Sequence, residues 1–110
     1  MTDSTLPIPS LGRTVHYRLK EFDADSINRR RLHAGRNMTM HIDQEYGVQL
    51  HVGNTVSAGQ YVAATIVTTF GNTPESAVNL KCHLDGADDY WATSVVHGEE
   101  PGQFIWPPRT

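Results

Sequence analysis

The last third of this 110-residue chain constrains its fold more than any other stretch. Between residues 78 and 84 apolar and polar side chains alternate, the period of a strand with one buried face. Extended runs follow at 90–96 and 103–106, separated by turns rich in Gly, Asp and Glu. Pro107 and Pro108 then remove backbone donors and end the pairing. These features predict antiparallel strands joined by short turns.

Aromatic residues in this region indicate what the core contains. Strict alternation along 90–96 places Trp91 on the same side as Val95, and we expect Trp91 and Phe104 to anchor the core. Trp106 lies beside two prolines near the end of the chain, so its ring is assigned either to the core or to an interface. Cys82 falls among the alternating apolar residues and is expected to be a buried, unreactive thiol.

The first two thirds of the chain predict further strands and a helical excursion. Val15, Tyr17 and Leu19 alternate in a first strand, and residues 61–70 form the longest strand. Between them a helix is expected to begin with Asp23 as its N-cap, with a second short helix at 37–46 and a minor strand from Val48 to Val52. The predicted fold is mainly β, with four to six strands in a small SH3-like barrel or a strongly curved antiparallel sheet. One or two helices lie between the first and second main strands.

Length and composition predict one domain. Residues 1–12 are expected to form an extended arm, and residues 13–110 a single β-barrel-like domain with its helical excursion at about 22–46. No apolar run approaches the length of a membrane span, which is about 18 residues or more. We therefore expect no membrane partner and a location in the cytosol where the protein is made.

Several segments together resemble a known group of proteins. They are GRTVHY (12–17), SINRRR (26–31), HVGNTVSAG (51–59), AVNLKCHLDGADDYWATS (77–94) and EPGQFIWPPR (100–109). This combination resembles small proteins encoded by tailed bacteriophages and prophages, whose shared pattern includes VHY, INRRR, VNLxVxLDGxDxxWxTS and PGxWxWPP motifs. Phe104 stands where that pattern usually has Trp. The resemblance implies a phage origin and a host-cell location, but no established activity, cofactor or catalytic residue.

Charge is distributed unevenly along the chain. Residues 1–36 hold seven basic and four acidic groups, and the remaining residues hold two basic and eight acidic groups. Such a chain suits self-association or an anionic ligand. Arg29, Arg30 and Arg36 are the candidate anion-binding residues, with Trp106 as an aromatic wall, because a guanidinium offers paired donors to phosphate or carboxylate. The alternative is a solvated helix face favoured by the helix dipole.

No motif in the sequence indicates catalysis or a bound metal. The six histidines show no metal-ligand spacing, and no nucleophile elbow is present. We expect no enzyme activity, no metal and no cofactor. Nucleic acid is a disfavoured partner, because the chain lacks a sustained basic stripe with interleaved aromatic residues.

The sequence leads to two functional hypotheses. The first is a non-enzymatic phage-encoded binding protein, a homo-oligomer that binds a host factor or, as a counter-defence protein, sequesters a small anionic, nucleotide-like ligand. The alternative is a virion protein at the capsid surface, the connector or the tail. Small barrels with extended arms suit that second role, and residues 1–12 have the composition of such an arm.

Overall fold

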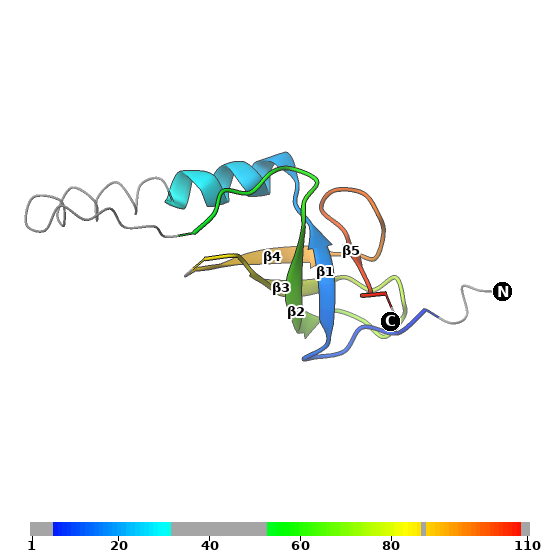
Figure 1. The fold of residues 1–110 in the computed structure, drawn as a ribbon. Coiled ribbons are helices and arrows are strands. Elements are labelled where there is room, and N and C mark those ends of the chain that lie inside the picture. Colours follow the sequence, from blue (N-terminus) through cyan, green and yellow to red (C-terminus); the bar gives the residue numbers. More distant parts are fainter. Residues whose placement is uncertain (1–5, 32–52, 87, 109–110) are drawn as a thin grey trace, which may run out of the picture.

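A computed structural model describes residues 6–31, 53–86 and 88–108. One antiparallel sheet of five strands dominates these residues. The strands are β1 (Thr14–Arg18), β2 (Tyr61–Thr69), β3 (Val78–His83), β4 (Asp89–Val95) and β5 (Phe104–Ile105). Residues 21–31 are helical and lie between β1 and β2 in the chain (Figure 1). The predicted mainly β fold with a helix after the first strand is confirmed.

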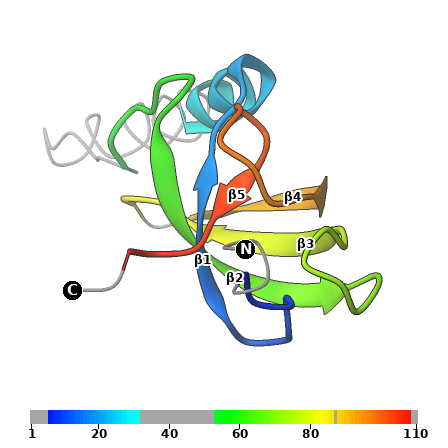
Figure 2. The same ribbon diagram turned by 90° about the vertical axis from the view of Figure 1, so that its right-hand side faces the viewer.

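The sheet is strongly curved and is not closed. Its strand order is β4-β3-β2-β1-β5, so β4 and β5 lie at the two ends. The long β2 pairs with β1 through its first half and with β3 over most of its length, and it bends between the two directions (Figure 2). An isolated parallel bridge between His97 and Phe104 links the chain just beyond β4 to β5.

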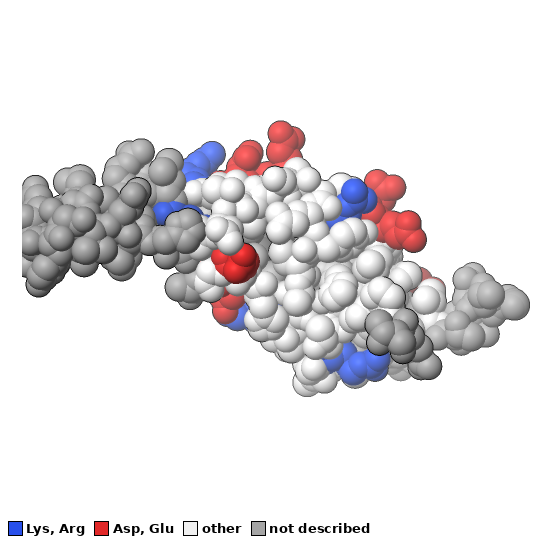
Figure 3. Space-filling view, in the orientation of Figure 1, with Lys and Arg blue, Asp and Glu red and all other residues white. Residues whose placement is uncertain are grey.

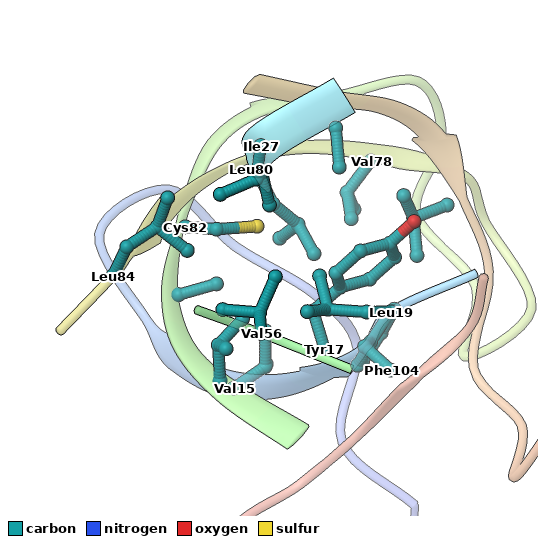
Figure 4. Close-up of a cluster of buried hydrophobic side chains, with 14 of the residues drawn as sticks. Val15, Tyr17, Leu19, Ile27, Val56, Val78, Leu80, Cys82, Leu84 and Phe104 are labelled. Atoms are coloured by element: carbon teal, nitrogen blue, oxygen red, sulfur yellow. The ribbon is translucent and has the colours of Figure 1, made fainter. Parts of the chain in front are cut away.

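Alternation on the inner face of the sheet builds the core. Val15, Tyr17 and Leu19 are at most 2% exposed, as predicted for the first strand. The β3 residues Leu80 and Cys82 are fully buried beside them. Ile27 reaches the same cluster from the helix, which covers one side of the curved sheet (Figure 4). Phe104 is also fully buried, as expected.

A buried carboxylate ties the helix to this core. Asp23 is 3% exposed and accepts hydrogen bonds from the hydroxyls of Tyr17, at 2.5 Å, and Tyr90, at 2.7 Å. Its Oδ2 also accepts the backbone N–H of Lys20 at 2.9 Å. Burial, and then the bond to Asp23, raise the pKa of both tyrosines well above the ordinary value, so both hydroxyls keep their protons.

The position of Asp23 corrects the predicted start of the helix. The helix begins at residue 21, and the Ala24 N–H bonds to the Lys20 carbonyl. Lys20 is therefore the N-cap residue, and Asp23 is the third helical residue, whose side chain reaches back to the N-cap N–H. The prediction of Asp23 as N-cap was wrong, because its carboxylate is held inward by two tyrosines that only the folded sheet brings near.

Several predicted features lie outside the described residues. These are the second short helix at 37–46, the minor strand from Val48 to Val52, and Arg36. Of the predicted arm, the structure describes residues 6–12, where Pro9 is buried and the Gly12 N–H bonds to the Ile66 carbonyl at 2.8 Å. In residues 6–31, 53–86 and 88–108 no helix has both the length and the apolar character needed to cross a membrane.

Replacing Asp23 tests the buried network. Asp23→Ala leaves two phenol hydroxyls and one backbone N–H without their acceptor, so we expect the free energy of unfolding to fall by about 3 kcal/mol. The matched control is Asp25→Ala on the same helix, an exposed residue whose loss should cost less than about 0.5 kcal/mol. Urea denaturation measures both. Equal losses in the two variants would show that the network does not hold the helix.

Candidate interaction surfaces

Arg31, which directly follows two of the predicted anion-binding arginines in the chain, forms a buried ion pair. The Arg31 side chain is 5% exposed, and its Nε and Nη2 both donate to Asp88 Oδ1, at 3.2 and 2.8 Å. Asp88 lies in the turn between β3 and β4, 57 residues further along the chain. The remaining guanidinium nitrogen, Nη1, donates to the Asn54 carbonyl. Arg31 therefore joins the helix to two remote segments, and its side chain is not available to a ligand.

Arg30 and Arg29 have different environments. Arg30 Nη2 donates to Asp88 Oδ2 at 2.8 Å and to the Asp89 carbonyl at 2.7 Å, while the side chain remains 47% exposed. Arg29 is exposed and makes no hydrogen bond or ion pair with any residue that the structure describes. Of the predicted anion-binding arginines, Arg30 is engaged within the chain, Arg29 is free of described partners, and Arg36 lies outside the described residues.

The two arginines set the charge of Asp88. The hydrogen bond from Arg31 is the largest influence and lowers the pKa of Asp88 below its ordinary value; partial burial opposes it, and Arg30 lowers it further. Asp88 is consequently an anion at neutral pH, held between two cations. We call the three residues Arg30, Arg31 and Asp88 the arginine clamp.

Further hydrogen bonds hold the chain where it returns at residue 53. Asn28 accepts the Val56 N–H at 2.9 Å and donates to the Val56 carbonyl at 2.8 Å, as a neighbouring strand would. Gly53 forms a bridge with Gly86, and a Cβ on Gly53 would lie 2.8 Å from Arg31 Cζ and 2.9 Å from the Gly86 Cα. Only glycine fits there without displacing the clamp.

The acidic turn after β3 is occupied by contacts within the chain. Asp85 accepts a hydrogen bond from Asn54 Nδ2 at 2.6 Å, Asp88 belongs to the clamp, and Asp89 pairs with Lys81 at 3.5 Å. Within the described residues no cluster of three or more His, Cys, Asp or Glu could hold a metal ion. These acids each have a separate partner, so together they serve to attach the turn to the helix and the returning chain.

Trp106 lies elsewhere on the molecule. Its ring packs edge-to-face on Phe104, with centroids 5.6 Å apart, and the Arg13 guanidinium lies 4.8 Å above it. Trp106 is half-buried against the core. Figures 1 and 2 place the C-terminal segment well away from the end of the helix that carries Arg29 and Arg30. One chain therefore does not bring these arginines and Trp106 together.

Trp91 is exposed on the outer face of the sheet, contrary to the prediction. It is 61% exposed, while Ala92 and Val95 of the same strand are buried. Strict alternation would put Trp91 and Val95 on one side, but the β3–β4 register shifts between Val78 and Leu80. Ser94 has a positive φ of 56°, and its N–H bonds to Asn79 Oδ1. This β-bulge reverses the phase, so Val95 turns inward and Trp91 outward.

The surroundings of Trp91 carry balanced charge. Lys81 lies directly across from it on β3, and Lys81 pairs with Asp89 on the same strand as Trp91.

In the view of Figure 3 most Lys, Arg, Asp and Glu side chains lie around the margin of the face, which leaves a broad area without charged groups. The face in that view has no continuous basic stripe.

Cys82 is fully buried, and burial raises the pKa of its thiol to about 12. The thiol is therefore un-ionised at neutral pH, which matches its predicted role as a small apolar residue.

Comparisons of this chain with protein-family models, curated proteins and solved structures give no match.

Asp88→Asn tests the arginine clamp. It leaves the buried Arg31 without its counter-charge, so we expect a loss of about 3 kcal/mol in unfolding free energy at neutral pH. Because folding lowers the pKa of Asp88, the ionised carboxylate stabilises the fold above its unfolded-state pKa, and this contribution disappears as pH falls through the folded-state value. The difference between wild type and variant should therefore shrink from about pH 4 downward.

The control for this experiment is Asp85→Asn, which alters an exposed carboxylate in the same turn. It should cost less than about 1 kcal/mol, since its single partner is an exposed amide. Urea denaturation of the three proteins over a pH series measures the differences. A pH-independent difference for Asp88→Asn would show that the carboxylate charge does not stabilise the fold.

Proposed function

We propose that this chain is a non-enzymatic, phage-encoded binding protein that acts in the host cytoplasm on a protein of the host. The observation that carries the protein-binding role is Trp91, which is 61% exposed on the outer face of the sheet; the phage origin and host location rest on the sequence resemblance alone. Tryptophan is enriched among the residues that dominate protein–protein binding energies. The core does not use this ring, since Ala92 and Val95 supply the inward side chains of β4.

The neighbours of Trp91 suit a protein surface as partner. Lys81 and Asp89 flank the ring with opposite charges, and the Thr65 hydroxyl lies 2.8 Å from His83 Nε2 on the adjoining strands. A central aromatic surrounded by polar, charge-balanced residues is the usual arrangement of a binding hot spot and its rim. Such a surface selects by shape and hydrogen bonding more than by net charge.

Capture of a small anionic ligand receives less support. Arg30 already donates to Asp88 and to the Asp89 carbonyl, and Trp106 lies at another part of the chain. Of the two predicted arginines that the structure describes, Arg29 retains a guanidinium without a described partner. A nucleotide site would therefore need Arg29 to be completed by groups from a second copy, and a single unpaired arginine on a helix surface is more simply a solvated residue.

Trp91→Ala tests the proposed surface. Affinity capture from host cells first supplies candidate partners, and the decisive measurement is the affinity of each purified partner for wild type and variants. Loss of a hot-spot tryptophan should weaken binding about 30-fold, equivalent to about 2 kcal/mol. Phe70→Ala is the matched control, because Phe70 is also an aromatic residue of 61% exposure, just beyond β2. A partner bound equally by all three proteins would contradict the assignment of Trp91.

A role in the virion is supported by a different observation. In the segment that precedes β1, Ile8 is 50% and Leu11 68% exposed, so these two apolar side chains lie outside the core. Extended segments with exposed apolar residues suit contacts with neighbouring subunits in an assembly. Quantitative mass spectrometry of purified particles separates the two roles. Many copies per particle would support the virion role, and abundance in infected cells with absence from particles would support the host-directed one.

A further inference from the structure

Arg13 and Trp106 lie at the end of the sheet that is opposite the helix. Arg13 directly precedes β1, and β1 runs from there toward the helix, as Figure 1 shows. Alternation continued one step beyond β1 and β5 gives the two residues the direction of the buried side chains Val15 and Phe104. Arg13 and Trp106 therefore meet just beyond the core.

The core holds the Trp106 ring in place. Phe104 is fully buried and packs edge-to-face on this ring, with centroids 5.6 Å apart and ring planes at 89°. The Arg13 guanidinium lies over the same ring, with its Cζ 4.8 Å from the centroid. Attraction to the ring restricts the guanidinium to fewer positions than a freely solvated arginine occupies.

The Arg13 guanidinium has no partner for its N–H groups among the described residues. The side chain is exposed and forms no hydrogen bond or ion pair with any of them. A guanidinium that stacks on an aromatic face leaves the donors at its edge available. Arg30 and Arg31, by contrast, already donate to Asp88. Arg13 therefore combines a restricted position with donors that are open to a ligand.

We propose that Arg13, positioned by Trp106, binds a carboxylate. The paired N–H groups at one edge of a guanidinium match the two oxygens of a carboxylate. The same match occurs within this protein, where Nε and Nη2 of Arg31 both donate to Asp88. A phosphate monoester carries up to two negative charges and is commonly bound by a cluster of arginines. One guanidinium on one ring suits a single carboxylate better.

The site differs from the anion site that the sequence predicts. There Trp106 is the aromatic wall for Arg29, Arg30 and Arg36, whereas the structure places Arg13, from the other end of the chain, on that ring. The inference goes beyond the proposed host-directed function, because it uses neither Trp91 nor its neighbours. The carboxylate can belong to a small acid or to an acidic side chain of a protein.

NMR of the wild-type protein tests the proposal, with the side-chain Nε–H signals of Arg13 and Arg29 compared in one spectrum. Sodium acetate replaces sodium chloride at constant ionic strength, in a mildly acidic buffer in which acetate is still ionised. Arg29 is the internal control, because it is also exposed and has no described partner. We expect acetate to bind Arg13 about tenfold more tightly than Arg29, since Trp106 restricts Arg13 in advance. Equal affinities would overturn the proposal.

Two variants separate the ring from the charge. Trp106→Leu keeps Arg13 and removes the ring, so acetate affinity at the Arg13 signal should fall to that of Arg29. Arg13→Lys keeps the charge and lacks the paired donors, so acetate should shift the Trp106 indole N–H signal with about tenfold lower affinity. Circular dichroism checks that both variants are folded. Unchanged affinity in either folded variant would contradict the role assigned to the residue replaced.

A second titration distinguishes the two sources of the carboxylate. The capped tripeptide alanyl-glutamyl-alanine presents one acidic side chain on a peptide backbone. Affinity for Arg13 about tenfold above that of acetate would support a protein as the source, and equal affinity would support a small acid. Inorganic phosphate that binds Arg13 more tightly than both would overturn the choice of carboxylate.

Discussion

The ion pair between Arg31 and Asp88 joins three segments that are remote in sequence: the helix, the chain that returns at Gly53, and the turn between β3 and β4. Moving any of them would leave a guanidinium that is 5% exposed without its counter-charge. The restriction extends to the backbone, since Gly53 and Gly86 approach one another beside the Arg31 side chain. Of the arginines that the sequence offers as anion-binding, Arg30 is also used to hold this turn, through Asp88 and the Asp89 carbonyl.

An ion pair of this kind contributes more to the arrangement of the segments than to net stability. Removing two charges from water costs several kcal/mol, and a well-packed apolar substitute is often as stable. An apolar contact would, however, tolerate sliding of the helix end, whereas the paired donors of Arg31 accept one orientation of the Asp88 carboxylate. Asp23 acts in the same way at the other end of the helix, where three donors converge on one carboxylate. Both helix ends are therefore positioned by polar geometry, and Ile27 between them by packing.

Much of the fold could be predicted because alternation is a local property. The inward residues of β1 and β3 and the burial of Phe104 follow from period two and turn chemistry alone. Trp91 could not be assigned in this way, because the bulge at Ser94 places Val95 on the same face as Ala92, whereas strict alternation places Val95 with Trp91. The hydrogen-bond partners of Asp23 and Asp88 could not be predicted from the sequence either, since they lie up to 67 positions away along the chain. For the arginine run, the sequence could show that a carboxylate was a suitable partner but not that this chain supplies it.

A single exposed aromatic residue on a small protein is ordinary, because much of any protein surface is apolar. Trp91 is more informative because the geometry of β4 determines its exposure. The bulge at Ser94 lets Ala92 and Val95 of the same strand fill the core, and the ring of Trp91 projects from the outer face of the sheet beside the Lys81–Asp89 pair. The fold satisfies every buried side-chain polar atom among the described residues, so this exposure does not reflect a generally loose structure. A protein that covered the ring would therefore bind a side chain that the core does not use.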